Sequence, residues 1–258
     1  MNLTLKIPEE LSEDLLSYLR GFGLKEAWVR GAVWSLQGEG VKVSYFPSGV
    51  VLIQGKGAER IRDLLLEKLG GLEGPVVGCD ESGKGDVFGP LVVCCAVVKP
   101  ENYLKLVQVA PRDGKSLTPQ QIAKKFSLMQ DLVDIRCRIM PPEELNALYK
   151  DMPNMNRVLT YLYKELLKEV PCQYPIVVDA YASRNPFGPK VTFVPKGEKN
   201  IAVACASIAA RYHFLQWLQR EGLPAGSSAK AMQEAHRILR EDPERARRTI
   251  KLFFLQKE

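Results

Sequence analysis

Residues 76 to 90 of the chain read Val-Val-Gly-Cys-Asp-Glu-Ser-Gly-Lys-Gly-Asp-Val-Phe-Gly-Pro. An apolar run ends there in two adjacent carboxylates, Asp80 and Glu81, and a glycine-rich loop follows at once. A short apolar run bounded by turn residues is typical of a buried β-strand. Sites in open α/β sheets form beyond the carboxyl ends of their strands. The stretch therefore predicts a functional site at the end of this strand.

Two further acids occupy comparable positions. A second apolar run, Ile176–Asp179, ends in Asp179, and Glu198 stands just before a helix expected over 201–221. Clustered carboxylates repel one another at low dielectric, and Mg²⁺ or Mn²⁺ relieves that repulsion through oxygen ligands. Any one of these acids could simply begin a loop or cap a helix. Four acids in such contexts favour a divalent-metal site that hydrolyses phosphodiesters.

Around this site the chain alternates strands and helices, which indicates an α/β domain. Strands are expected at 76–80, 91–98, 134–140, 176–179 and 191–194, and helices at 119–133, 141–149, 156–169, 201–221, 229–240 and 243–254. Residues 1–70 have a different pattern: a helix from Pro8 to about Arg20, strands at 28–36, 41–46 and 50–54, and a helix at 58–69. Residues 70–75 have the composition of a linker. We therefore expect a small N-terminal domain over 1–70 and a larger one over 75–258.

Composition narrows the functional classes. Apolar residues make up 46% of the 258 residues, which is a globular profile. The start of the chain lacks the pattern of a signal peptide and no apolar run is long enough to span a bilayer, so a cytoplasmic protein without a membrane partner is expected. Residues 184–258 carry fourteen basic and seven acidic residues. That surplus suits a polyanionic partner, although solvated helix faces explain it equally well.

The six cysteines form no C-x-x-C pair, and four of them lie in apolar runs. This pattern favours buried free thiols in a reducing compartment over a disulfide framework or a zinc site. The two histidines, His213 and His236, lie in expected helices and are interpreted as ordinary surface or packing residues.

The glycine loop has a rival interpretation. Gly78 followed by Gly83-Lys84 matches the start of a phosphate-binding loop, but position 85 is glycine where that motif requires a hydroxyl. Asp80 and Glu81 would also place negative charge inside the loop that should hold phosphate. An NTPase is therefore disfavoured.

Several of these motifs resemble one family. The segment Asp80–Pro90 is similar to the first active-site motif of type 2 ribonucleases H, and its last five residues look like the bacterial ribonuclease HIII branch. Residues 112–117, 176–179 and 196–212 resemble the family's other motifs, and a glutamate at position 198 is the HIII-like choice. The likeness covers roughly residues 75–254. Gly114, Val87 and Phe253 depart from the usual family residues, and none of these three is an acid of the expected site.

The resemblance implies a ribonuclease H-like fold and a smaller N-terminal α+β domain resembling the TATA-binding-protein fold, which helps to hold the substrate. It also implies endonucleolytic cleavage of the RNA strand of RNA–DNA hybrids, leaving 5′-phosphate and 3′-hydroxyl ends. The expected catalytic residues and ligands of Mg²⁺ or Mn²⁺ are Asp80, Glu81, Asp179 and Glu198. The expected substrate contacts are Gly83, Lys84, Gly85, Lys115, Asn154 and Arg211.

Two surfaces complete these expectations. The helix at 243–254, with Arg245, Arg247, Arg248 and Lys251, could track the nucleic-acid backbone. In the N-terminal domain Trp28, Arg30, Trp34, Lys42 and Tyr45 are candidates for an exposed strand surface, although Trp28 and Trp34 could instead pack against a helix. Nothing in the sequence requires more than a monomer. A nucleic-acid-binding module with structural acids is the competing class, and the placement of the four acids argues against it.

Overall fold

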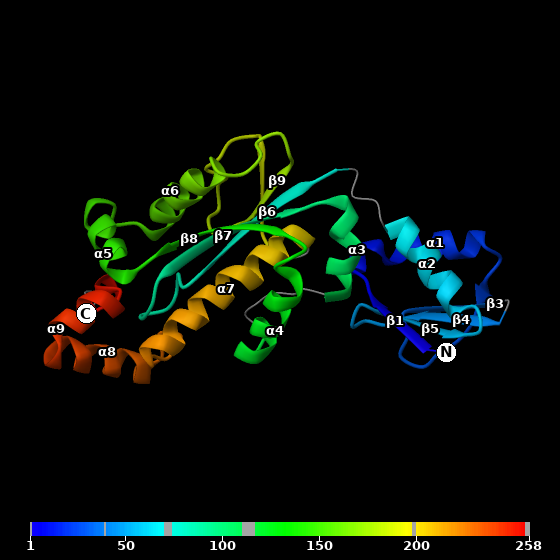
Figure 1. The fold of residues 1–258 in the computed structure, drawn as a ribbon, viewed down its shortest axis with the longest axis horizontal. Helices are drawn as coiled ribbons and strands as arrows, with labels where there is room; N and C mark the ends of the chain where they lie inside the picture. The colour runs from blue at the N-terminus through cyan, green and yellow to red at the C-terminus, as the bar shows by residue number, and fades with distance from the viewer. Residues whose placement is uncertain (1, 39, 70–73, 110–116, 198–199, 256–258) are drawn as a thin grey trace. The chain divides into compact units, whose positions relative to one another are not determined.

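The computed structural model describes residues 2–38, 40–69, 74–109, 117–197 and 200–255. They divide into two compact units (Figure 1): Met1–Gly74 with Lys99–Ala110, and Pro75–Val98 with Pro111–Glu258. The segment around Pro100 thus belongs to the first unit although it follows the first two strands of the second.

The first unit is a five-stranded antiparallel sheet in the order β1-β5-β4-β3-β2, with helices against one face. Its strands are β1 (Asn2–Lys6), β2 (Lys25–Glu26), β3 (Trp34–Gly38), β4 (Val41–Tyr45) and β5 (Val50–Gly55). Its helices are η1 (Glu9–Leu11), α1 (Ser12–Gly21), α2 (Ala58–Leu69) and α3 (Pro100–Val109). Alternate strand residues such as Leu36, Val43 and Ile53 pack with Leu15 and Leu65 of the helices.

The second unit is built on a mixed five-stranded sheet in the order β10-β9-β6-β7-β8. Its strands are β6 (Val76–Ser82), β7 (Leu91–Val98), β8 (Asp134–Met140), β9 (Ile176–Asp179) and β10 (Val191–Val194). Its helices are α4 (Pro119–Met129), α5 (Pro142–Asp151), α6 (Met155–Leu167), α7 (Ile201–Glu221), α8 (Ala229–Glu241), α9 (Pro243–Thr249) and η4 (Leu252–Phe254). Figure 1 shows α7 along one face of this sheet and α6 on the other.

The central strands β6 and β7 are apolar throughout most of their length because both of their faces are covered. All eight residues of β7 are buried, as expected for a strand between two helical layers. The strand β6 pairs antiparallel with β7 and parallel with β9. The carboxyl ends of β6 and β9 therefore lie at the same edge of the sheet.

Several expected elements were wrong. The strand expected at 28–36 is β3, which begins only at Trp34, and β1, β2 and α3 were not predicted. Trp34 and Tyr45 are buried and stacked, and the Trp34 indole N–H donates to the Ser12 hydroxyl, so neither belongs to an exposed surface. The helix expected at 243–254 ends at Thr249, because Ile250 forms a β-bridge with Phe88.

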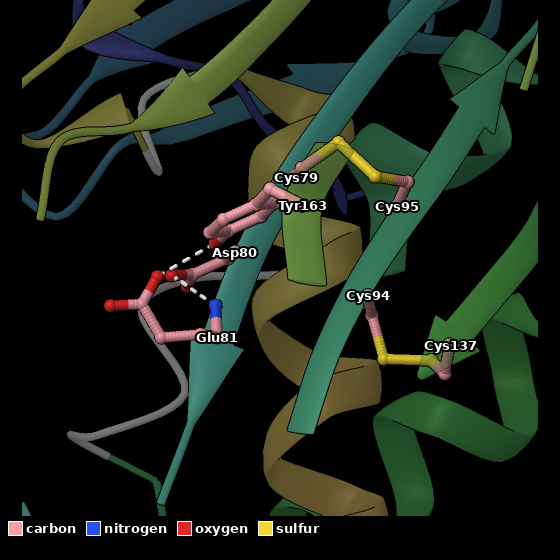
Figure 2. The surroundings of a disulfide bond; sticks show 7 residues. All are labelled: Cys79, Asp80, Glu81, Cys94, Cys95, Cys137 and Tyr163. Atoms are coloured by element: carbon pink, nitrogen blue, oxygen red, sulfur yellow. Dashed lines mark hydrogen bonds between the residues drawn. A yellow bond between two sulfur atoms is a disulfide. The ribbon is translucent and has the colours of Figure 1, made fainter. Parts of the chain in front are cut away.

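The expectation of free thiols was also wrong for four of the cysteines. Disulfides join Cys79 to Cys95 and Cys94 to Cys137 (Figure 2), while Cys172 and Cys205 are free. Both bonds link residues directly opposite on neighbouring strands. Adjacent residues of a strand point to opposite faces, so Cys94 and Cys95 place one disulfide on each face of the sheet. Which cysteines lie opposite one another depends on how the strands pair, and cysteine spacing in the sequence does not contain this information.

We predict that breaking the Cys94–Cys137 bond destabilises the second unit. The disulfide closes a separation of 43 residues, for which the loop-closure entropy of the unfolded chain corresponds to about 4 kcal/mol. Cys137→Ser should lower the denaturant midpoint under non-reducing conditions, whereas Cys172→Ser, at an exposed free cysteine, should not. Addition of dithiothreitol should lower the denaturant midpoint of the wild type to that of Cys137→Ser or below it. An unchanged midpoint for wild type in dithiothreitol would contradict this role.

Candidate active site

The end of β6 directs two neighbouring carboxylates to opposite faces of the sheet. Cys79 lies in the apolar core that includes α6, so the alternation of the strand turns Asp80 toward α7 and Glu81 back toward α6. The contacts agree, because Asp80 interacts with Ser207 of α7 and Glu81 with Tyr163 of α6. Figure 2 shows Asp80 and Glu81 at this strand end, with the hydrogen bond from Tyr163 to Glu81.

Asp80 is buried, with 5% of its surface exposed. Helix α7 approaches β6 so closely that a Cβ on Gly78 would lie 2.0 Å from the backbone nitrogen of Val203. Only glycine permits this approach, which brings Ser207 within hydrogen-bonding reach of Asp80. The Asp80 carboxylate also accepts a hydrogen bond from the Glu81 backbone N–H at 2.8 Å.

Burial, together with the negative charges of Glu81 and Asp179, raises the pKa of Asp80 from 3.8 to about 8, while hydrogen bonds from Ser207 and the Glu81 backbone oppose the shift. Among the described residues, no cationic side chain contributes to this balance. A divalent cation stabilises a buried carboxylate that lies within electrostatic reach of two other carboxylates. The donor set therefore fits a hard cation.

Asp179 reaches the same edge through the parallel pairing of β6 with β9. Cys79 is paired with Val178, so the residues that follow them, Asp80 and Asp179, extend from neighbouring strands. Val178 belongs to the core that includes α6, which turns Asp179 to the same face as Asp80. The Asp179 carboxylate accepts a hydrogen bond from the backbone N–H of Gly197 at 2.8 Å.

Glu198, the fourth expected acid, lies outside the described residues, as does Lys115. On the described side, Gly197 contacts Asp179, and Asn200 caps α7 by accepting from the backbone N–H groups of Ala202 and Val203. Within the described ranges, no three histidine, cysteine or acidic side chains are close enough together to form a complete metal site.

Glu81 is held from the α6 side. The Tyr163 hydroxyl donates to Glu81 Oε2 at 2.6 Å, and the Tyr163 ring stacks on that of Tyr181 with 5.4 Å between centroids. Lys84 donates to the backbone oxygen of Tyr181 at 3.2 Å and lies over its ring. Nothing in the sequence pattern singled out Tyr163, because its spacing in α6 is that of a core residue.

The glycine loop has one constrained glycine and one open glycine. Gly83 has φ of 91°, and a Cβ there would lie 2.2 Å from the backbone oxygen of Pro90. Around Gly85 no atom lies within 4 Å of the corresponding Cβ position. Gly83 is therefore required for the conformation of the loop, whereas the backbone at Gly85 is accessible to another molecule.

The C-terminal segment clamps this loop. Lys251 is fully buried and donates to the backbone oxygens of Asp86 and Phe88, both at 2.9 Å. Burial lowers the pKa of Lys251 to about 7, although the charge of Asp86 opposes the shift. Lys251 thus belongs to the loop's support, and its expected place on a surface that tracks a nucleic-acid backbone was wrong.

The other expected contacts lie in varied surroundings. Asn154 caps α6, its side-chain oxygen accepting from the backbone N–H groups of Asn156 and Arg157. Arg211 lies over the Phe214 ring, and its Nε is buried without a hydrogen-bond partner among the described residues. Arg247 pairs with Glu143 and Glu244 at the surface. His213 packs against Phe126 and Tyr212, in keeping with a packing role.

A family model described as Ribonuclease HII matches residues 77–251, which include the whole of the strand-end site. Ribonuclease HIII of Aquifex aeolicus (strain VF5) is 41% identical over 94% of this chain and 96% of its own length. The chain belongs to the type 2 ribonuclease H family, in its ribonuclease HIII branch.

Solved ribonuclease HIII structures have the same fold. Aquifex aeolicus RNase H3 aligns with a TM-score of 0.63 at 39% identity, covering 98% of this chain and 100% of that one. Bst-RNase HIII in complex with Mn²⁺ aligns with a TM-score of 0.65 at 24% identity, covering 98% and 96%, and this likeness concerns the fold alone. The ribonuclease H-like α/β fold with a smaller additional domain is thus established for this chain. Among the described residues, no helix is long and apolar enough to cross a membrane.

We predict different effects for alanine at the two loop glycines. Gly83→Ala forces a positive φ and a clash with Pro90, and should destabilise the protein by about 1–3 kcal/mol. Gly85→Ala meets open space and should change stability by less than about 0.5 kcal/mol, yet weaken hybrid binding if substrate approaches the backbone there. Urea unfolding and binding titrations in parallel distinguish the two. Equal stability losses for both variants would rule out this division of roles.

We also predict that Asp80 makes the metal-free protein less stable as the pH rises. The folded pKa of about 8 exceeds the unfolded value of 3.8, so the folded state binds a proton more tightly between these values and stability falls through this window. Asp80→Asn removes this contribution and should lose less stability between pH 4 and pH 8 in EDTA than wild type. The exposed Asp131→Asn is the matched control, and denaturant midpoints at several pH values provide the measurement. Parallel curves for wild type and Asp80→Asn would refute it.

Proposed function

We propose that this chain is an endoribonuclease that hydrolyses the RNA strand of RNA–DNA hybrids and leaves 5′-phosphate and 3′-hydroxyl ends. The observation that carries the proposal is that Asp80 and Asp179 follow paired residues of the parallel strands β6 and β9, and that the charges of Glu81 and Asp179 both act on buried Asp80. Membership of the type 2 ribonuclease H family indicates that these carboxylates serve phosphodiester hydrolysis. All of the residues come from one chain, so a monomer suffices for the site.

Asp80, Glu81, Asp179 and Glu198 would hold one or two divalent cations, Mg²⁺ or Mn²⁺. Such a cation, when bound, lowers the pKa of an attacking water and stabilises the leaving oxygen of a phosphodiester. The chain's own contribution is to place negative charge where burial makes it costly without a cation. Asp80 is fixed by α7, Asp179 by Gly197 and Glu81 by Tyr163. The Mn²⁺ complex of Bst-RNase HIII supports this choice of ions.

The proposed substrate contacts are Gly83, Lys84, Gly85, Lys115, Asn154 and Arg211. Gly83 and Gly85 would let backbone groups approach a ribose 2′-hydroxyl, the group that distinguishes RNA from DNA. Lys84, Lys115 and Arg211 would contact phosphates, and the buried Nε of Arg211 offers an unused donor among the described residues. Asn154 caps α6, and this structural role accounts for its side chain. Its proposed substrate contact therefore rests on the family resemblance alone.

We propose that the N-terminal domain, expected over residues 1–70, is TATA-binding-protein-like and binds substrate, and that residues 75–258 form the catalytic domain. Its five-stranded antiparallel sheet with helices on one face supports that likeness. Trp28, with 83% of its surface exposed, is available for contact, whereas Trp34 and Tyr45 are not. The cytoplasm is the compartment we propose, because RNA–DNA hybrids form where DNA is copied and transcribed.

Cleavage of a labelled RNA–DNA hybrid tests the proposal. With Mg²⁺ or Mn²⁺ the RNA strand should be cut into fragments with 5′-phosphate ends, and EDTA should abolish cutting. Asp80→Asn should lose at least about 100-fold in rate, more than the 10- to 100-fold typical of losing a group behind a metal ligand. Its hybrid binding should be preserved or improved, because the variant removes negative charge near the phosphates.

The exposed Asp131→Asn should cut like wild type. Glu198→Gln should resemble Asp80→Asn, which tests the fourth ligand directly. Intact RNA in every lane, with tight hybrid binding, would instead favour a binding module whose acids are structural. Full activity in Asp80→Asn would defeat the assignment of the site.

A further inference from the structure

Behind Glu81 lies an ordered group of side chains that the proposed chemistry does not use. Tyr163 is fully buried in α6, and its hydroxyl is 2.6 Å from Glu81 Oε2 (Figure 2). An ionised carboxylate only accepts hydrogen bonds, so the tyrosine is the donor. The contact joins α6 to the end of β6, two elements whose bonded residues are 82 positions apart in the sequence.

The Tyr163 ring is fixed by its neighbours. It is nearly parallel to the Tyr181 ring, at 6° with 5.4 Å between centroids, and Phe187 meets it edge-on at 5.9 Å. Tyr181 is in turn fixed at its hydroxyl, which lies 2.7 Å from the Thr160 hydroxyl. Thr160 donates to the backbone oxygen of Asn156, so the Tyr181 hydroxyl is the donor in that pair.

This arrangement leaves the Tyr163 hydroxyl little freedom. A side chain held in a stack of aromatic rings can point its hydroxyl in one direction only, and here that direction is toward Glu81. A glutamate side chain has three rotatable bonds and loses considerable rotamer entropy when it is fixed. Tyr163 supplies a fixed donor that selects one orientation, in which Oε2 is engaged on the α6 side.

We propose that Tyr163 is a positioning residue that orients the Glu81 carboxylate for divalent-cation binding, a role that rests on the proposed function. Groups that hydrogen-bond metal ligands from behind commonly contribute roughly 10- to 100-fold to metal affinity or activity. Tyr163 itself touches neither cation nor substrate. Its effect is exerted through Glu81, and Tyr181 with Phe187 holds it in place.

The test compares Tyr163→Phe, which keeps the ring and its stacking, with Tyr161→Phe on the exposed side of the same helix. Mn²⁺ binding is measured by isothermal titration calorimetry, and cleavage is measured across a range of Mn²⁺ concentrations. Tyr163→Phe should bind Mn²⁺ roughly 10-fold more weakly, and saturating Mn²⁺ should restore most of kcat. The KM for hybrid and the melting temperature without metal should stay near wild type, and Tyr161→Phe should match wild type throughout.

A double-variant cycle separates positioning from packing. In a Glu81→Gln background, Tyr163→Phe should cause no further loss of Mn²⁺ affinity, since the carboxylate it orients is gone. Equal additional losses in both backgrounds would overturn the proposal, as would wild-type Mn²⁺ affinity in Tyr163→Phe. Wild type that neither binds Mn²⁺ nor cleaves hybrid would sink the proposed function instead, so the two failures are distinguishable.

A measurement on wild type covers the case in which Tyr163→Phe does not fold. With ¹³C-labelled tyrosine, Mg²⁺ should shift the ring-carbon resonance next to the Tyr163 hydroxyl, because the cation withdraws charge from Glu81. The Tyr161 resonance should not move. A Tyr163 resonance that is insensitive to Mg²⁺ at saturation would exclude the coupling.

Discussion

Burial of Asp80 among other carboxylates at the end of β6 sets the electrostatics of the whole candidate site. Asp80 is buried beside Glu81 and within electrostatic reach of Asp179, and its pKa is raised to about 8 as a result. A protein that keeps such a group sacrifices stability in its metal-free state. In the described part of the chain no cationic side chain compensates this buried negative charge. The strand end therefore favours binding of a divalent cation from solution.

The surrounding fold keeps these acids in place from three sides. Helix α7 lies against β6 at Gly78 and brings Ser207 to Asp80. Helix α6 brings Tyr163 to Glu81 from the opposite face of the sheet. The parallel neighbour β9 carries Asp179, which Gly197 holds through its backbone N–H. Because consecutive strand residues alternate between faces, one strand end can place two adjacent acids against two different helices.

A second set of contacts fixes the glycine loop that follows β6. Lys251 donates to two of its backbone oxygens, and Asp86 accepts from the backbone N–H of Gly226. The isolated bridge between Phe88 and Ile250 adds a backbone pairing to the same clamp. The C-terminal segment thus supports the glycine loop from within the core, which explains why the expected basic helix ends at Thr249.

The strands that carry Asp80, Glu81 and Asp179, and the family of the chain, follow from sequence patterns alone. Strands β7, β8, β9 and β10 and helices α2 and α7 have the bounds that local periodicity predicted, because apolar runs and helical spacing are local properties. The order of residues 80–90 is distinctive enough on its own to indicate the enzyme class.

Features that depend on pairing between distant segments come from the tertiary fold. Short strands such as β1 and β2 are defined by their partners, β5 and β3, and the disulfides by a strand register that cysteine spacing does not contain. Tyr163 and Ser207 carry the spacing of core residues, and Lys251 lies in what the sequence predicted as a basic helix surface. Their polar contacts come from segments as far as 165 residues away. Local sequence periodicity indicates which face of a helix or strand a residue occupies. The residues that it contacts on that face depend on the tertiary fold.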